Sequence, residues 1–408
     1  MSTPDVCLIS PYPPRGERHG GHSGVASYTA NLAHALAGEG AGVAVVAPRL
    51  EGEPDRTSDG PVQVLRRVRS GGPSVLPAAA LAAGQTGAPA VHLQHETFLY
   101  GGPASAAGLA PALAALRARR ATVVTMHHVV DPRAVDADFV ALHRVSAPVP
   151  LARAGMAAIR SSIARLADAV VVHEPGFAGV VDGARVVPHG VEPGVPAGAA
   201  DAATAQRTAT FRASHGLDDG RLTVLCFGFL APYKGLERVL EAGRLAAESV
   251  HVVVAGGEHP RMEGPGGYAD ELRAQHGDHA TFTGRVDDAD VAACFGAADL
   301  AAFLYPQPVS SSGALALALA HRTPMLVSRE LAGSAGVPDA LVAPSGAPAL
   351  AARLRDLAVD GAARAALRDV AAELLAGRTW PAVARTHLDL YAEVSHSERG
   401  PRWSLRAA

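Results

Sequence analysis

The sequence of 408 residues contains a single lysine, Lys234, only three cysteines, and no run of eighteen consecutive apolar residues. Without such a run, no conventional membrane-spanning helix is expected. Cys7, Cys226 and Cys294 lie in apolar stretches and lack a CxxC spacing, which indicates core residues of a reducing compartment and not a disulfide framework. The amino terminus also lacks the charged and apolar segments of a secretion signal. These absences together predict a cytoplasmic protein.

Charge of either sign is scarce. The chain has 36 basic and 39 acidic residues, and this near-neutral balance argues against a nucleic-acid-binding protein, so a small ligand is expected. Eighteen histidines occur, but no HExxH motif and no paired Cys/His spacing, so we expect no metal site. Six arginines form basic clusters that could contact an anionic membrane surface, although solvated helix and strand faces explain them more simply. These are Arg66, Arg67, Arg69, Arg117, Arg119 and Arg120.

Length and apolar content indicate two domains. Apolar residues make up 48% of the chain, and strand-like runs alternate with helix-length segments, which predicts α/β domains with mostly parallel sheets. The segment 193–210 is poor in large apolar residues and rich in Gly, Pro and Ala, as a linker would be. We therefore predict domains over 1–192 and 211–377. Residues 378–408 should form a last helix, packed back on the first domain, and a frayed tail. The excess of alanine and arginine is typical of an actinobacterial-type genome.

The stretch 222–235, LTVLCFGFLAPYKG, predicts a strand, a turn and the start of a helix. Gly228 ends the apolar run, and Lys234 comes just before the amphipathic segment LERVLEAGRLA. Ligands of open α/β sheets bind beyond the carboxyl ends of the strands, so Lys234 is positioned to hold an anion. A solvated lysine after a strand is the alternative.

A glycine-bearing loop, PYPPRGERHGGHSG, follows the first predicted strand and precedes a helix. Its glycines would let backbone N–H groups approach a phosphate closely, although the spacing is not GxGxxG and does not support a dinucleotide. Ser23 and Gly24, at the start of the helix, are the candidate phosphate contacts. A flexible surface loop is the alternative.

Polar residues end four strands of the predicted first domain. A buried parallel strand should stay apolar, so polar residues collected at strand carboxyl ends indicate a lined cleft. Satisfied core or surface histidines are the alternative. The residues are His95, Glu96, His127, His128, His173, Glu174 and His189.

Stretches spread over nearly the whole chain match one family in order and spacing. They are SGVASYTANLAHALA, TMHH, ADAVVVHE, VVPHGVE, GFLAPYKGLERVLEA, VVVAGG, ATFTGRVDDADVAACFGAADL and ALAHRTPMLVS. The chain thereby resembles the retaining GT-B-fold glycosyltransferases of family 4, the glycosyl transferases group 1. The resemblance implies two Rossmann-like, doubly wound domains facing a cleft. It also implies a nucleotide-sugar donor on the C-terminal domain, an acceptor on the N-terminal domain, and no metal or other cofactor.

The resemblance also assigns roles to single residues. Lys234 matches the family lysine that contacts the donor diphosphate, and Gly24 matches the glycine beneath that phosphate. His127, in the sequence Thr-Met-His, matches the histidine at the reacting sugar. The segment whose backbone recognises the nucleobase corresponds to Gly284, Arg285 and Val286.

The sequence departs from the family pattern at two places. Phe229, which we expect to be buried, stands where the family usually has a second phosphate-binding arginine. Val309 and Leu317 stand where the family usually has paired glutamates that bind the donor sugar and ribose, and neither side chain accepts a hydrogen bond. The loop between them offers hydroxyl and N–H groups to a phosphate or sugar instead. Its residues are Ser310, Ser311, Ser312 and Gly313.

These features predict a retaining, metal-independent glycosyltransferase that moves a hexose from a nucleoside diphosphate to a hydroxyl of a small metabolite, lipid or glycan. Lys234 would stabilise the leaving diphosphate, and His127 would act at the reacting sugar. A catalytically silent protein that binds sugars or nucleotides is the alternative, because the arginine and both glutamates are missing. A glycan phosphorylase of the same fold would need a pyridoxal-binding lysine, and the strand-end context of Lys234 suits a phosphate better.

Overall fold

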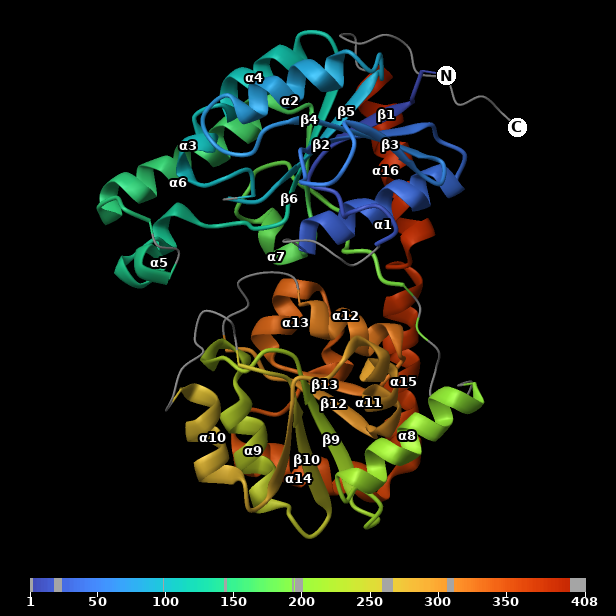
Figure 1. Ribbon diagram of the computed structural model, residues 1–408. Coiled ribbons are helices and arrows are strands. Elements are labelled where there is room, and N and C mark those ends of the chain that lie inside the picture. The colour runs from blue at the N-terminus through green and yellow to red at the C-terminus, as the bar shows by residue number, and fades with distance from the viewer. Residues whose placement is uncertain are drawn as a thin grey trace. The chain divides into compact units, whose positions relative to one another are not determined.

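Runs of buried aliphatic residues form two largely parallel sheets in the computed structural model, one in each of two compact units (Figure 1). Unit 1 comprises Met1–Gly190 and Trp380–Ala408, and unit 2 comprises Val191–Thr379. The structure describes residues 3–17, 24–97, 99–142, 145–192, 194, 201–258, 267–306 and 312–396.

The sheet of unit 1 has eight strands in the order β3-β4-β2-β1-β5-β6-β7-β8. All neighbours pair in parallel except β3 and β4. Alternate residues of a strand face opposite sides, so Val6 and Leu8 pack in one core and Cys7 and Ile9 in the other. The strands are β1 Val6–Ile9, β2 Val43–Pro48, β3 Arg56–Asp59, β4 Val62–Val68, β5 Ala90–His95, β6 Ala121–Met126, β7 Ala169–Val172 and β8 Arg185–Val186.

Helices cover both faces of this sheet (Figure 1). On one face lie α2 Val75–Gly84, α4 Leu109–Arg117 and α6 Val149–Leu166. On the other face, α1 Gly24–Gly38 packs against the last helix, α16 Trp380–His396. The expected return of the last helix to the first domain is therefore confirmed. Short helices complete the unit: α3 Pro103–Ala106, α5 Ala137–Leu142 and α7 Pro175–Ala178.

The sheet of unit 2 is parallel, with the order β11-β10-β9-β12-β13. The chain runs outward from β9 to one edge and then returns to build the other side from β12, so the strand order reverses between β9 and β12. Ligands of open α/β sheets bind at such a reversal, beyond the carboxyl ends of the strands. The strands are β9 Leu222–Phe227, β10 Val250–Ala255, β11 Ala280–Gly284, β12 Leu300–Phe303 and β13 Met325–Val327. The helices are α8 Ala202–Ser214, α9 Leu236–Leu245, α10 Tyr268–His276, α11 Val291–Ala297, α12 Gly313–Ala320, α13 Arg329–Ala335, α14 Ala347–Val359 and α15 Gly361–Ala376.

The predicted linker over 193–210 is in part a helix. Residues 202–210 belong to α8, which starts where the Asp201 carboxylate accepts a hydrogen bond from the Thr204 N–H at 2.7 Å. None of the residues of α8 is fully buried. The weak apolar pattern hid the helix, because most of its residues face solvent.

One arginine of the predicted basic clusters is not at the surface. The side chain of Arg66 is 3% exposed, and its guanidinium donates to the carbonyls of Tyr12 and Pro13. Arg66 therefore holds the loop after β1 and cannot contact a membrane. Cys7, Cys226 and Cys294 are buried and free, as predicted. Within the described ranges, no helix has the length and apolar composition needed to cross a membrane.

Candidate functional site

Three glycines close the carboxyl ends of β9, β10 and β11. The Gly228 N–H donates to the carbonyl of Ala255 at 2.9 Å, and the Gly256 N–H donates to the carbonyl of Gly284 at 2.8 Å. A Cβ atom on Gly256 would lie 2.0 Å from the carbonyl oxygen of Gly228, so no larger residue fits there. Bare backbone therefore forms this edge of the sheet, and a ligand can approach the strands closely.

Lys234 ends a short 3-10 turn, Pro232–Lys234, that lies between β9 and α9. Gly235 follows with a φ of 62°, and a Cβ atom there would lie 2.2 Å from the carbonyl oxygen of Leu304. Only glycine fits this left-handed, closely packed position. The strand, turn and helix predicted around 222–235 are confirmed, and the turn places Lys234 where the strand order reverses.

The ammonium group of Lys234 has a neutral polar partner. Its Nζ donates to Tyr305 Oη at 2.7 Å and lies 4.4 Å from the centroid of the same ring. Across the described part of the chain, no carboxylate forms an ion pair with it. Burial without a compensating negative charge lowers the pKa of Lys234 from 10.5 to about 8.

A helix N-terminus faces the same space. Tyr305 Oη lies 2.9 Å from Ser312 Oγ, and this serine caps α12 by accepting a hydrogen bond from the Leu315 N–H at 3.2 Å. The first N–H groups of a helix have no partner within it, and its N-terminus carries partial positive charge. Gly313 and Ala314, which begin α12, line the same cavity as Lys234. An ammonium group and a helix N-terminus thus converge on one cavity, an arrangement that suits an anion.

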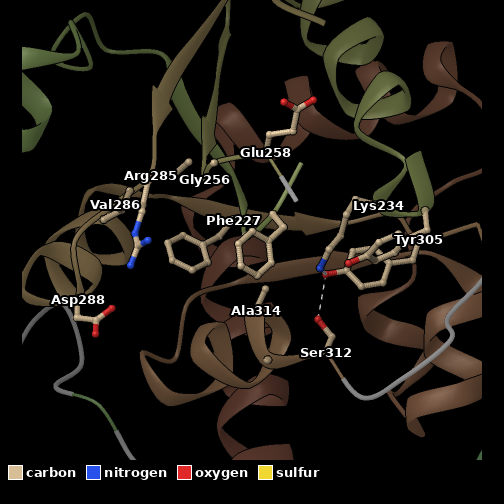
Figure 2. Close-up of a pocket in the computed structure, with 16 residues that line it drawn as sticks. Phe227, Lys234, Gly256, Glu258, Arg285, Val286, Asp288, Tyr305, Ser312 and Ala314 are labelled. Atoms are coloured by element: carbon tan, nitrogen blue, oxygen red, sulfur yellow. Dashed lines mark hydrogen bonds between the residues drawn. The ribbon is translucent and has the colours of Figure 1, made fainter. Parts of the chain in front are cut away.

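The cavity has a volume of about 590 Å³, which is typical of a small-molecule site. Figure 2 shows Arg285 entering it on the side opposite Lys234. Val286 and Asp288 line the cavity near Arg285. One end therefore carries the lysine and the helix N-terminus, and the other carries a guanidinium and a carboxylate.

Most of the residues predicted for donor binding meet in this cavity. Those that line it are Gly228, Lys234, Arg285, Val286, Ser312 and Gly313. Gly284 supports the floor through its carbonyl, whereas Gly24 begins α1 in unit 1. Ser23, Ser310 and Ser311 lie outside the described residues.

The prediction that Phe229 is buried is wrong. Its side chain is 52% exposed and lines the cavity, because β9 ends at Phe227 and Phe229 belongs to the turn beyond the sheet. Leu317, at one of the glutamate positions of the family, packs on α12 against the core of unit 2. Val309, at the other position, lies outside the described residues.

Tyr305, Tyr233 and Glu258 also line the cavity, and sequence reasoning did not select them. Tyr305 follows β12 by two residues, so the strand-end argument applied to the histidines could have found it. Burial raises the pKa of Tyr305, which therefore keeps its proton and can serve the lysine as a neutral acceptor.

In unit 1, three of the strand-end histidines surround the ring of Tyr28 from α1. The ring centroids of His127, His173 and His189 lie 4.6, 5.0 and 5.0 Å from that of Tyr28. The Tyr28 hydroxyl is buried and has no hydrogen-bond partner in the described structure. Aromatic packing therefore holds these histidines together.

Hydrogen bonds occupy both ring nitrogens of His127. Its Nε2 lies 2.8 Å from Gln94 Oε1, and its Nδ1 lies 3.2 Å from His173 Nε2. His173 Nδ1 in turn donates to the carbonyl of Val187 at 3.0 Å. Burial lowers the pKa of His127 well below 6.5, and the neighbouring histidines lower it further. A neutral His127 satisfies both contacts when the NH2 group of the Gln94 amide donates to its Nε2 and its own Nδ1 donates to His173 Nε2, because His173 Nδ1 already donates to Val187.

His95 and Glu96 face a different space. They line a second cavity of unit 1, with a volume of about 480 Å³. Burial, and to a smaller extent His128, lowers the pKa of His95 to about 4. Glu174 is buried at the start of α7. The strand-end residues predicted to line one cleft are thus divided between the ring cluster at Tyr28 and a separate cavity.

Comparisons with known proteins agree on the fold. Residues 221–360 match the family model described as Glycosyl transferases group 1. The fold is similar to that of sucrose-phosphate synthase from Thermosynechococcus elongatus, with a TM-score of 0.67 and 20% identity over 95% of this chain and 98% of that one. It is also similar to Anabaena HepE in complex with UDP-glucose, with a TM-score of 0.61 and 14% identity over 95% and 99% of the two chains.

A third similar structure is the N-terminal domain of trehalose-6-phosphate phosphatase from Candida albicans, with a TM-score of 0.68 and 11% identity over 97% of both chains. Among curated proteins, none matches this sequence. At these identities the likenesses establish the GT-B fold, with two Rossmann-like units.

Proposed function

We propose that this chain transfers a hexose from a nucleoside-diphosphate sugar to an acceptor hydroxyl with retention of configuration, because residues 221–360 match the family model of the glycosyl transferases group 1 and the chain has the GT-B fold. The acceptor belongs to the small metabolites, lipids or glycans. In this proposal the cavity at the carboxyl edge of the unit 2 sheet holds the donor.

The convergence of Lys234 and the N-terminus of α12 carries this proposal. The lysine is largely buried and lacks a carboxylate partner among the described residues, which is unfavourable for the empty protein. A diphosphate would supply the missing negative charge and would accept hydrogen bonds from both the ammonium and the helix. The position at the reversal of strand order supports the same assignment.

The chemistry of the transfer explains why these groups suit a diphosphate. As the bond between the sugar carbon and the phosphate oxygen breaks, negative charge grows on the leaving diphosphate. Lys234 and the oriented N–H groups of α12 stabilise that charge more strongly than the charge of the bound donor. Arg285 and Val286, at the far end of the cavity, would bind the nucleoside.

His127 is proposed to position the reacting sugar. Its two hydrogen bonds fix the ring, and its low pKa keeps the ring neutral, so it contributes orientation and does not act as a cation. Positioning of this kind lowers the barrier because the reacting groups need no further ordering.

The proposal is tested with nucleoside diphosphates. HepE was solved with UDP-glucose, so UDP is the first probe, with ADP and GDP as alternatives. A nucleotide at about 100 times its Kd should add about 2.7 kcal/mol of apparent stability, measured as a shift in melting temperature. Hydrolysis of the corresponding sugar nucleotide is then followed by release of the diphosphate. If none of the three diphosphates shifts the melting temperature, the donor assignment is wrong.

A catalytically silent protein that binds nucleotides is the second candidate. The exposed Phe229 and the partly buried Leu317 favour it, because they stand where the family usually has polar ligands. One measurement, the release of sugar from a sugar nucleotide, distinguishes the two candidates. A silent protein would bind the diphosphate but would release no sugar from a sugar nucleotide, with or without an added acceptor.

A further inference from the structure

The second cavity, which lies within unit 1, is lined mainly by apolar side chains and has a polar end. Its volume is about 480 Å³, and it lies beside α3, α4 and α6 at the carboxyl end of β5. Leu109, Met156 and Ile159 are among its apolar lining residues, and His95, Glu96 and Thr97 stand at its polar end. This volume is typical of sites for drug-sized molecules.

Helix α6 leaves much of its apolar surface uncovered. Of its 18 residues, only Ile163 is fully buried. Leu151, which lines the cavity, is 63% exposed. Apolar surface of a helix is normally packed against a neighbour, so a face left open toward a cavity indicates a ligand that covers it.

The polar end carries two unsatisfied groups. His95 Nδ1 and Thr97 Oγ1 are both buried, and neither has a hydrogen-bond partner in the described structure. Their residues are 5% and 8% exposed. Buried polar atoms without partners are destabilising and rare, and the two residues that carry them are two apart in the chain and both line this cavity. A ligand that reaches this end with one hydroxyl can accept a hydrogen bond from the threonine and donate one to the histidine.

The charges at the cavity restrict the ligand further. Neither arginine nor lysine is among the described residues that line it, and the only acidic one is Glu96. No arginine or lysine among these lining residues would compensate the charge of a phosphorylated or carboxylated ligand. A free monosaccharide would place many hydroxyls against hydrocarbon, where they would lose hydrogen bonds to water.

We propose that this cavity binds the acceptor, and that the acceptor is an uncharged apolar alcohol whose hydroxyl lies at His95 and Thr97. This inference rests on the proposed transfer function, since it names the class of acceptor for that reaction. The low pKa of His95, about 4, keeps the imidazole neutral and able to accept the hydrogen bond at pH 7.

The probe is 2-naphthol, with 2-methoxynaphthalene as a matched compound that cannot donate a hydrogen bond. Binding to the full chain is measured by calorimetry, with glucose and glucose 6-phosphate as polar comparisons. We expect 2-naphthol to bind at least about threefold more tightly than its methyl ether, because the ether leaves one polar group unpaired. Equal or tighter binding of the two sugars would overturn the proposal.

Substitutions in the cavity locate the binding. Ala152→Trp on α6 fills the cavity and should weaken 2-naphthol binding by about tenfold or more. The control is Ala154→Trp, an exposed position of the same helix that does not line the cavity. Should Ala152→Trp fail to fold, Ala158→Trp, at an exposed lining position, repeats the test. Unchanged affinity in the blocked variant would show that the alcohol binds elsewhere.

Thr97→Val tests the polar end of the cavity, because it should affect stability and ligand affinity in different ways. The hydroxyl has no partner, so its loss should leave the melting temperature unchanged or raise it, while the affinity for 2-naphthol falls about three- to tenfold. A loss of stability together with unchanged affinity would mean that the hydroxyl has a structural role, and the proposal would fall.

UDP binding and product formation separate this inference from the proposed function. If UDP raises the melting temperature and a sugar nucleotide is hydrolysed, but 2-naphthol does not bind, then the transferase assignment stands and the acceptor class is wrong. If 2-naphthol binds in the cavity but no naphthyl glycoside forms with any sugar nucleotide that binds, the acceptor role is wrong. Formation of the glycoside, and its loss in Ala152→Trp, is the expected result.

Discussion

Lys234 of unit 2 and the histidines of unit 1 all lie near the carboxyl ends of parallel strands, but their polar groups have different hydrogen-bond partners. Lys234 has a neutral tyrosine as its partner and no carboxylate within the described residues. His127 has a hydrogen bond at each ring nitrogen. A charge left without a counter-ion indicates a ligand that will supply one, whereas a saturated ring indicates fixed orientation. This contrast supports the proposals that Lys234 binds the donor and that His127 positions the sugar.

The largest effect is expected from removing the lysine. A hydrogen bond to a charged group contributes about 1.5–3 kcal/mol, so Lys234→Ala should weaken binding of UDP by about 10- to 150-fold. Turnover should fall further, because the charge on the leaving oxygen grows toward the transition state. Calorimetry and initial rates provide the two measurements.

Lys234→Arg is the matched variant for this test. It keeps the positive charge but changes the shape of the donor, so it should retain more of the affinity than Lys234→Ala. If Lys234→Ala binds UDP as tightly as the parent protein, the phosphate assignment is wrong, and the contrast between the two regions disappears.

His127→Ala should affect stability as well as rate. The substitution leaves His173 Nε2 and the Gln94 amide without their partner, which should lower the free energy of unfolding by about 1–3 kcal/mol. If the ring positions the sugar, kcat and kcat/KM should fall together while UDP affinity stays the same. Denaturant unfolding and steady-state kinetics measure the two effects.

Tyr28→Phe is the control in the same cluster. It removes a buried hydroxyl that has no partner but keeps the ring against which the histidines pack. Stability should therefore stay the same or increase.

The prediction for His127→Ala has its own contradicting outcome. A fully active and fully stable His127→Ala would show that the histidine neither positions the sugar nor supports the cluster.

The pH dependence of UDP binding should reflect the protonation of Lys234. The pKa of Lys234 is about 8 in the empty protein, and the diphosphate binds the charged form, so affinity should be constant between about pH 7 and pH 8. Above pH 8 it should fall by up to about tenfold per pH unit, until the raised pKa of the complex is reached. UDP itself does not change charge in this range, because its terminal phosphate ionises near pH 6.

The lowered pKa of Lys234 also affects stability, and here a rise in pH is favourable. The pKa of Lys234 is lowered on folding from 10.5 to about 8, so the unfolded chain binds more protons between these values. The lysine therefore destabilises the empty protein below pH 8, and this effect disappears as the pH rises from about 8 to 10.5. Lys234→Arg, which stays charged, should show neither dependence. A flat affinity profile for the parent protein would contradict the assignment.

The smallest effect is expected from Phe229→Arg, which restores the cation of the family pattern. The side chain is 52% exposed and lines the proposed donor cavity of unit 2, so the substitution should change the free energy of unfolding by less than about 0.5 kcal/mol. UDP affinity should increase by about threefold to tenfold, because the exposed charge is screened by solvent. In the Lys234→Ala background, the same arginine should restore part of the lost affinity. Reduced affinity in both backgrounds would mean that the Phe229 ring itself contacts the ligand.

The sequence by itself determined the alternation of strands and helices, because buried parallel strands need continuous apolar runs and glycines are needed where the backbone turns sharply. It also placed Lys234 correctly, since a strand, a glycine and a helix start follow one another within 222–235. Local patterns of this kind are decided by neighbours along the chain. The order of the strands and the antiparallel β3 depended on pairing between distant segments, which no local pattern records.

Only the tertiary structure decided which polar groups contact one another or line the same cavity. Tyr305, from the segment after β12, contacts Lys234, and Ser312, at the N-cap of α12, contacts Tyr305; both lie more than 70 residues beyond the lysine in the chain. Among the strand-end residues of unit 1, His127 is bonded to His173, whereas His95 faces a separate cavity with Thr97. The exposure of Phe229 and the burial of Arg66 were decided in the same way. Sequence pattern fixes the strand on which a side chain lies, but its partners and solvation depend on the packing of segments that are far apart in the chain.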